Sequence, residues 1–399
     1  MPIALLKIVR PTLVRSHRYS GLFLAAILCI SGLTGSIVVF RNEIDAALNP
    51  DFFKAVHPAH GLALSTLLNA LSEQHPTQKI TGLIYRPPEN RTIEAFSTDT
   101  LQDRNGDSER DIFVDPMDGH IQGERPSEGC CLNRRAIMSF VYRLHYSLDL
   151  GKSGMWILGL SAILWSIDCV VGLFLTFPLS LTAERSYWGR WVKAWTISFG
   201  RSQARLVFDL HRAVSLWLWV ILLGVAVSGV SLTLDEEIFQ PVVKAIFPTD
   251  PPLIVRQRTS SVSGVSVDEA ETIAVSFARA RGETARPAAV LFAPSGESAT
   301  FFLFSDNGSE PAGLGSPVVT VDLKSGDVTA DEFPGRGRIG NLILQLQSPW
   351  HSGRIAGLTG RIMIALSGLG VCLLSVTGVM IWWRKDQARR KHLPAARRR

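Results

Sequence analysis

Four long apolar stretches constrain the fold of this chain more than any other feature. They cover residues 19–40, 155–177, 213–234 and 362–383. Each is about 20 residues long, which is what a helix needs to cross roughly 30 Å of hydrocarbon. Three contain no charged residue, and the second contains only Asp168. Because 46% of all residues are hydrophobic and only 19% are charged, we expect a membrane protein and not a soluble one.

The positions of the basic residues predict the orientation of the spans. Lys and Arg gather before the first span, between the second and third, and after the fourth, and short basic segments stay in the cytoplasm. The first span lacks a cleavage site and is interpreted as an uncleaved anchor. The predicted organisation is a cytoplasmic start (1–18), spans at 19–40, 151–178, 213–234 and 358–383, outer domains at 41–150 and 235–357, a cytoplasmic linker (179–212) and a basic tail (384–399).

The two halves of the sequence repeat one another. His17 and Gly35 lie 194 residues before His211 and Gly229, whereas His145 and Gly172 lie 206 residues before His351 and Gly378. Each half therefore has one span, one outer segment and one span, and both halves run in the same direction across the membrane. The predicted fold class is a membrane α-helical protein with four transmembrane helices in two parallel repeats and two extracytoplasmic α+β domains.

Both outer segments show the pattern of a helix followed by strands. Polar caps and helical periodicity predict the helices, and short β-type runs that end in turns predict the strands. The predicted helices cover residues 62–72 and 266–280, and the predicted strands cover 79–85, 92–96, 111–115, 288–292, 300–304 and 317–322.

Four of the nine histidines stand at the ends of the predicted spans. The topology puts His17 and His211 on the cytoplasmic side and His145 and His351 on the outer side. Two neutral imidazoles that face each other between helices can hold the iron of a b-type haem as axial ligands. The sequence therefore predicts two haem b per chain. An arginine near each histidine can hold the haem propionates: Arg18, Arg212, Arg143 and Arg354.

These motifs resemble the PepSY-associated transmembrane proteins. The shared features are the His-Arg entry to a span, the Thr-Gly or Ser-Gly within it, and outer strands that end in V-D-x-x-x-G. Residues 167–178 are similar to the ferrisiderophore reductases of the FoxB type. The resemblance implies a bacterial inner-membrane oxidoreductase that passes electrons from an unknown cytoplasmic or membrane donor to a periplasmic Fe(III)-siderophore, of hydroxamate type. The alternatives are a siderophore transporter and a PepSY-type regulatory protein without redox activity.

Other sequence features narrow the function. The basic residues flank spans, so nucleic acid is not an expected partner. The sequence has no complete phosphate-binding loop, and its predicted cytoplasmic segments are too short to hold a nucleotide-binding domain, so the electron donor must be another molecule.

The roles of several further residues have more than one interpretation. We interpret Asp168 as a hydrogen-bonding partner of a neighbouring helix, with proton handling or tuning of the haem surroundings as the alternative. Cys130 and Cys131 are two thiols or a redox pair. Trp188, Trp191 and Trp195 lie at helical spacing and predict an interfacial helix or a docking face for a donor. His57 and His60 are solvated residues or line an outer pocket.

Overall fold

The structure is a computed structural model that describes residues 3–57, 62–88, 90–99, 109–127, 129, 133–178, 187–200, 202–251, 264–304 and 312–392. Cys130, Cys131 and His60 lie outside these residues. The chain forms two compact units. The helical unit contains Met1–Val39, Tyr142–Val242 and Trp350–Arg399, and the sheet unit contains Phe40–Val141 and Val243–Pro349.

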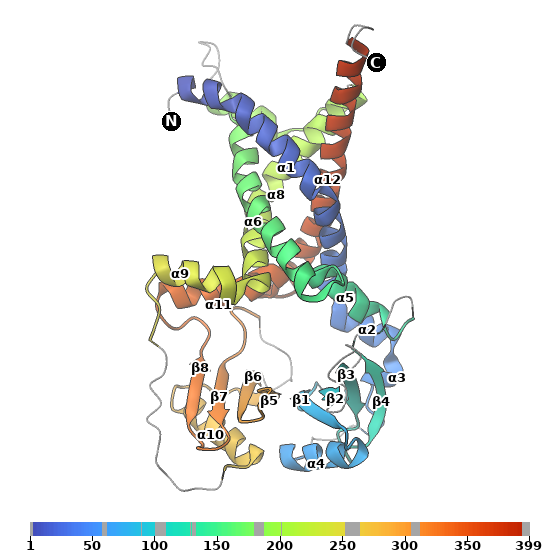
Figure 1. Cartoon of the computed structure of the whole chain (residues 1–399), viewed down its shortest axis with the longest axis vertical. Helices are drawn as coiled ribbons and strands as arrows, with labels where there is room; N and C mark the ends of the chain where they lie inside the picture. The colour runs from blue at the N-terminus through green and yellow to red at the C-terminus, as the bar shows by residue number, and fades with distance from the viewer. Residues whose placement is uncertain are drawn as a thin grey trace. The chain divides into compact units, whose positions relative to one another are not determined.

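Four long helices build the helical unit, as the apolar stretches predict. They are α1 (Ile3–Val38), α6 (Gly151–Thr176), α8 (Gln203–Thr233) and α12 (Gly357–His392). Each is long and apolar enough to cross a membrane. The helices form a closed ring in which α1 packs on α12 and α6, and α8 packs on the same two helices. Both ends of the chain lie at one end of this bundle (Figure 1), as four crossings require.

Small residues let the spans approach one another closely. A methyl group added at Gly32 of α1 would lie 2.6 Å from the carbonyl oxygen of Gly368 on α12. Near this contact, the Ser36 hydroxyl donates to the carbonyl oxygen of Ala365, 2.7 Å away. Close backbone contact of this kind, together with hydrogen bonds across helices, holds membrane helices together where lipid offers no hydrophobic driving force.

The two histidines predicted for the outer side lie on short helices that are separate from the spans. His145 is in α5 (Ile137–Ser147) and His351 is in α11 (Ile339–Ser352). The prediction that His145 and His351 stand at the ends of spans needs a correction, because each lies on a separate helix next to a span. Leu148 and Asp149 have positive φ angles of 52° and 57°, which end α5 before α6 begins. Likewise, α11 ends at Ser352, and Gly353, with a φ of 75°, leads into the 3₁₀ turn Arg354–Ala356.

The sheet unit is built around one antiparallel sheet of eight strands in the order β4-β3-β2-β1-β5-β6-β7-β8. The first outer segment forms one half of the sheet and the second forms the other. Their two central strands pair directly, with Leu83 opposite Val290. The sequence suggested two outer domains, but each half leaves an unpaired edge strand, and pairing these edges satisfies their backbone groups. The strands are β1 (Gln78–Ile84), β2 (Ile93–Asp99), β3 (Glu109–Val114), β4 (Ile121–Pro126), β5 (Arg286–Phe292), β6 (Ser298–Phe304), β7 (Val318–Asp322) and β8 (Val328–Glu332).

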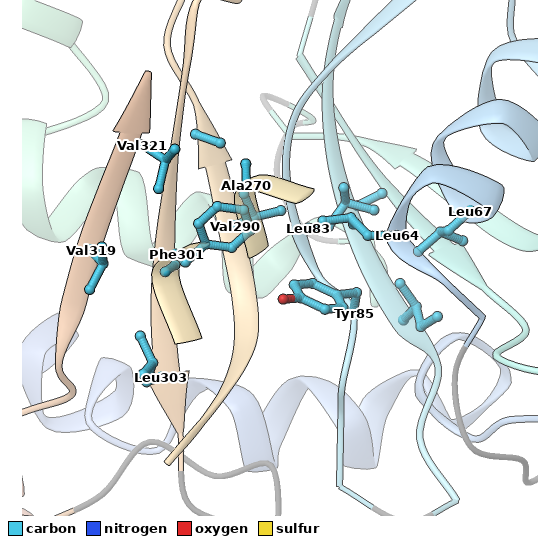
Figure 2. Packing of buried hydrophobic residues seen from close by; sticks show 14 of the residues in the cluster. Leu64, Leu67, Leu83, Tyr85, Ala270, Val290, Phe301, Leu303, Val319 and Val321 are labelled. Atoms are coloured by element: carbon cyan, nitrogen blue, oxygen red, sulfur yellow. The ribbon is translucent and has the colours of Figure 1, made fainter. Parts of the chain in front are cut away.

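One helix from each half covers the sheet and closes its core. They are α4 (Leu64–Gln74) and α10 (Val267–Arg279), whose Leu and Ala side chains are buried against alternating strand residues. Figure 2 shows Tyr85 and Phe301 among these buried side chains. The capping box between Ser266 and Glu269 starts α10 at the predicted residue. The remaining helical segments are α2 (Arg41–Leu48), α3 (Pro50–Phe53), α7 (Tyr187–Trp191), the 3₁₀ turn Val192–Trp195, the π-turn Asp235–Phe239 and α9 (Gln240–Ile246).

Candidate cofactor site: two histidine pairs

The structure brings the four predicted histidines together as two pairs. The ring centroids of His17 and His211 lie 6.3 Å apart, and those of His145 and His351 lie 6.1 Å apart. The pairs lie at different levels of the bundle. His145 contacts residues 31–35 of α1, and His351 contacts residues 225–229 of α8. These segments begin 14 residues beyond His17 and His211, a rise of about 21 Å along a helix.

Three of the histidines are held through Nδ1 in the same way. Nδ1 of His145 lies 3.1 Å from the Ser31 carbonyl oxygen and 3.2 Å from the Thr34 hydroxyl. Nδ1 of His211 lies 3.1 Å from the Leu374 carbonyl oxygen and 3.0 Å from the Thr377 hydroxyl. Nδ1 of His351 lies 2.9 Å from the Ser228 hydroxyl and also bonds the backbone at Val225. In each case a carbonyl oxygen and the hydroxyl three residues later share one imidazole nitrogen.

The hydroxyl groups decide which ring nitrogen carries the proton. The hydroxyls of Thr34, Ser228 and Thr377 each donate to the carbonyl oxygen four residues earlier in their own helix, at 2.7–2.8 Å. Each hydroxyl oxygen can therefore only accept from the imidazole, so Nδ1 carries the hydrogen. Nε2 is then the ring nitrogen whose lone pair can bind a metal. A metal ligand needs this tautomer.

His17 has a different partner. Its Nδ1 lies 3.0 Å from Oδ2 of Asp168 on α6, which is an ion-pair distance without the straight geometry of a hydrogen bond. The other carboxylate oxygen, Oδ1, accepts a hydrogen bond of 2.6 Å from the hydroxyl of Ser20 on α1. The interpretation of Asp168 as a polar link to a neighbouring helix is confirmed, and the partner is one of the four histidines.

A glycine lies beside Cε1 of every one of these rings. A methyl group added at Gly35 would lie 2.8 Å from Cε1 of His145, and one at Gly229 would lie 3.9 Å from Cε1 of His351. The corresponding distances are 3.4 Å from Gly172 to His17 and 3.3 Å from Gly378 to His211. The glycines that the repeat revealed therefore make room for imidazole rings.

Burial keeps the outer pair neutral. Removal from water lowers the pKa of His145, and it lowers the pKa of His351 to about 4, with the nearby His145 adding to the second shift. Both side chains are uncharged at neutral pH, and the neutral imidazole is the form that binds a metal.

The predicted arginine partners have different surroundings. Arg143 donates from Nε to Asp149 at 2.8 Å, and Arg354 lies in the 3₁₀ turn after His351. Arg18 follows His17 on α1 and is partly exposed. Arg212 donates from one terminal nitrogen to the carboxylate of Asp209 at 2.9 Å. Its Nε is buried and has no hydrogen-bond partner among the described residues, so it can take one more acceptor.

No conventional metal cluster accompanies the pairs. Among the described residues, no group of three or more His, Cys, Asp or Glu side chains is arranged to hold a metal ion. A metal bound between two imidazole nitrogens by bonds of about 2 Å separates the ring centroids by roughly 6 Å. Both observed separations match this value, so each pair can clamp a metal that takes its other ligands from a cofactor.

The sequence comparison covers both pairs and all four spans. A family model described as the PepSY-associated TM region matches residues 14–385. The chain belongs to this family. No curated protein is similar enough to the chain to count as a relative. As a member of the PepSY-associated TM family with four membrane helices, the protein is a multi-pass membrane protein.

Sequence reasoning missed the partners of the histidines in this PepSY-associated protein. The sequence pattern gave Thr34, Ser228 and Thr377 only as parts of Thr-Gly or Ser-Gly pairs. A usable signal was present, because in three of the four repeat-related segments a hydroxyl residue stands directly before the glycine. Trp350 was also missed. Its indole packs on Gly224, where any side chain would collide with it, and its buried Nε1 has no hydrogen-bond partner among the described residues.

The remaining candidate residues lie apart from the pairs. Nδ1 of His57 lies 3.3 Å from Asp115 in the sheet unit. Trp188, Trp191 and Trp195 lie on α7 and the following turn, as their spacing predicts, and their rings meet edge to face. The Trp191 indole donates to the Thr176 hydroxyl at the end of α6. These tryptophans fix the linker against the spans.

Proposed function

We propose that this protein is a di-haem b ferric-siderophore reductase of the bacterial inner membrane. The observation that carries the proposal is the arrangement of the four histidines: two pairs at different levels of the bundle, with ring centroids 6.3 Å and 6.1 Å apart, the separation expected of two imidazoles that share a metal. The two imidazoles of each pair would hold a b-type haem, which would supply one-electron chemistry between Fe(II) and Fe(III).

The surroundings of the pairs fit haem in three ways. Hydrogen bonds fix the tautomer of three histidines, as is usual for metal-binding imidazoles. Glycines leave space beside the rings. A buried arginine nitrogen beside His211 and a buried indole nitrogen beside His351 lack acceptors within the described residues, and a haem propionate is the acceptor that such groups can bind.

The two pairs define a path across the membrane. Electrons enter at the end held by His17 and His211 and leave at the end held by His145 and His351. The basic residues before α1, in the linker and after α12 support a cytoplasmic location for the first end. An inside-negative membrane potential then favours outward electron movement by about 2.3 kcal/mol per 100 mV for a full crossing. We infer that the two halves are parallel repeats related by an axis along the membrane normal.

The substrate class rests on chemistry and on the family resemblance. Hydroxamate oxygens are hard ligands that hold Fe(III) much more tightly than Fe(II), so the addition of one electron loosens the metal. The two segments of the sheet unit follow α1 and α8 in the chain, so the proposed topology makes them periplasmic. The electron donor is a separate molecule on the cytoplasmic side or in the membrane.

The reductase proposal and its alternatives differ in one measurable property. The protein would be purified in detergent, reduced with a limiting amount of dithionite, and mixed with a ferric hydroxamate complex. We expect reoxidation of the haem at the rate at which Fe(II) appears, and we expect His351→Ala to be slow because it lacks a ligand of the outer pair. His211→Ala, which keeps the outer pair, is the matched control and should still reduce the complex.

Two results would contradict the proposal. A transporter would be supported if the complex did not reoxidise the haem and vesicles that contain the protein nevertheless accumulated labelled siderophore. Protein that folds without haem in cells supplied with ample haem would support a regulatory membrane protein.

A further inference from the structure

Four five-residue segments hold the four histidines, and one of them departs from the pattern. Residues 31–35, 225–229 and 374–378 read SGLTG, VAVSG and LSVTG, so each has a hydroxyl residue just before its glycine. Residues 168–172 read DCVVG, with Val171 at the hydroxyl position and Asp168 at the first position. The segment that lacks the hydroxyl is therefore the one that has a carboxylate.

The two halves also differ on the helix that carries the histidine. Ser20, three residues after His17, donates a hydrogen bond to the Asp168 carboxylate. The position three residues after His211 is Val214, and the residue that corresponds to Asp168 is Leu374. The first half thus has a polar pair, Ser20 and Asp168, where the second half has an apolar pair. Paired replacement at contacting positions indicates a site built to hold a carboxylate.

The carboxylate and the carbonyl group are not equivalent partners for an imidazole. The Asp168 carboxylate lies 3.0 Å from Nδ1 of His17, and its negative charge attracts the Nδ1 proton more strongly than a neutral carbonyl oxygen does, which makes the opposite nitrogen a stronger donor to a bound metal. A negative charge close to an iron also favours the more positive oxidation state. Both effects favour Fe(III) over Fe(II), and both act on His17 and not on the outer pair.

We propose that Asp168 is a positioning residue that strengthens His17 as a haem ligand and lowers the reduction potential of the inner haem relative to the outer one. This inference rests on the proposed function, because it concerns the haem between His17 and His211. The arrangement makes the electron path run downhill from the cytoplasmic end to the outer end. It also accounts for a carboxylate within a membrane span, where such a group is unfavourable unless a partner stabilises it.

The test compares midpoint potentials in a background that contains one haem. His351→Ala removes the outer haem, so an optical redox titration reports the inner haem alone. Two variants are then added separately. Asp168→Asn keeps the shape of the side chain and removes its charge. The double variant Asp168→Leu with Val171→Thr converts residues 168–172 to the pattern of residues 374–378. We expect each to shift the reduction equilibrium at least tenfold toward Fe(II), which is about 59 mV upward for a one-electron couple.

The outcomes separate the inference from the proposed function. A midpoint unchanged in both variants, with the inner haem bound, would overturn the role of Asp168. If Asp168→Asn loses haem, the double variant decides: haem with a raised midpoint supports the inference, and haem with the parental midpoint refutes it. Loss of the inner haem from both variants would also refute it, because Asp168 would then be needed for binding itself. Absence of haem from the parent protein would instead remove the proposed function.

Discussion

Adding one methyl group at Gly35 should weaken the outer cofactor site, whereas the same change at Gly229 should not. The two glycines occupy the same position in the two halves and face the two histidines of one pair. In Gly35→Ala the new carbon would lie 2.8 Å from Cε1 of His145, but in Gly229→Ala it would lie 3.9 Å from Cε1 of His351. Ordinary carbon contacts begin near about 3.5 Å, so the His145 ring must retreat by roughly 0.7 Å.

This displacement is large compared with what a metal bond tolerates, which is about 0.2 Å. Overpacking typically costs about 1–3 kcal/mol, so we expect outer haem affinity to fall roughly 5- to 150-fold in Gly35→Ala. Haem content per chain and the ferric spectrum measure the effect. The inner haem should remain, because His17 and His211 do not contact this glycine.

Helix stability provides an internal control for this comparison. Alanine favours a helix over glycine by about 1 kcal/mol, so neither substitution should unfold α1 or α8. Unfolding of the haem-free protein should therefore be unchanged or shifted to higher temperature in both variants. The reasoning is refuted if Gly35→Ala keeps two low-spin haems at wild-type affinity, or if Gly229→Ala loses haem to the same extent.

Three further predictions follow from the same structure. Thr34→Val removes an acceptor of the His145 Nδ1 proton and should weaken the outer haem about 10- to 100-fold by titration with haem, and equal affinity would exclude an orienting role. His351→Ala should lose the outer haem and His211→Ala the inner one, and equal loss of both from either folded variant would contradict the pairing. Arg125→Met leaves the buried carboxylate of Asp45 without its ion pair and should cost about 3–5 kcal/mol of sheet-unit stability, measured as a lower Tm, with haem spectra unaffected; an unchanged Tm would contradict the importance of this pair.

The membrane helices and most elements of the sheet were predictable because local patterns specify them. Long apolar runs specify the spans, and alternating side chains between turns specify strands such as β6. The edge strands β4 and β8 were missed because their residues, such as Arg125 and Asp331, are polar and do not alternate clearly. The pairing of β1 with β5 could not be predicted from the sequence either. It joins residues some 200 positions apart and depends on which strand edges the two halves leave unpaired.

The candidate site was predictable in its residues but not in its geometry. The repeat identified His17, His145, His211 and His351 as candidates, because the corresponding histidines of the two halves stand near corresponding ends of the spans. Which atoms orient them depends on how neighbouring helices rotate and on where α5 and α11 turn back, and neither is encoded by periodicity. The link from His17 to Asp168 joins residues about 150 positions apart, so only the packed bundle reveals it.

The most direct test of the account is the optical spectrum of the purified protein with haem counted per chain. Protein expressed with ample haem would be extracted in mild detergent and recorded in oxidised and dithionite-reduced forms. Two low-spin b-type haems per chain, reduced to one in His351→Ala, are the predicted result. A folded wild-type protein without haem, or with haem that every one of the four histidine variants retains in full, would contradict the central claim that the two histidine pairs are haem sites.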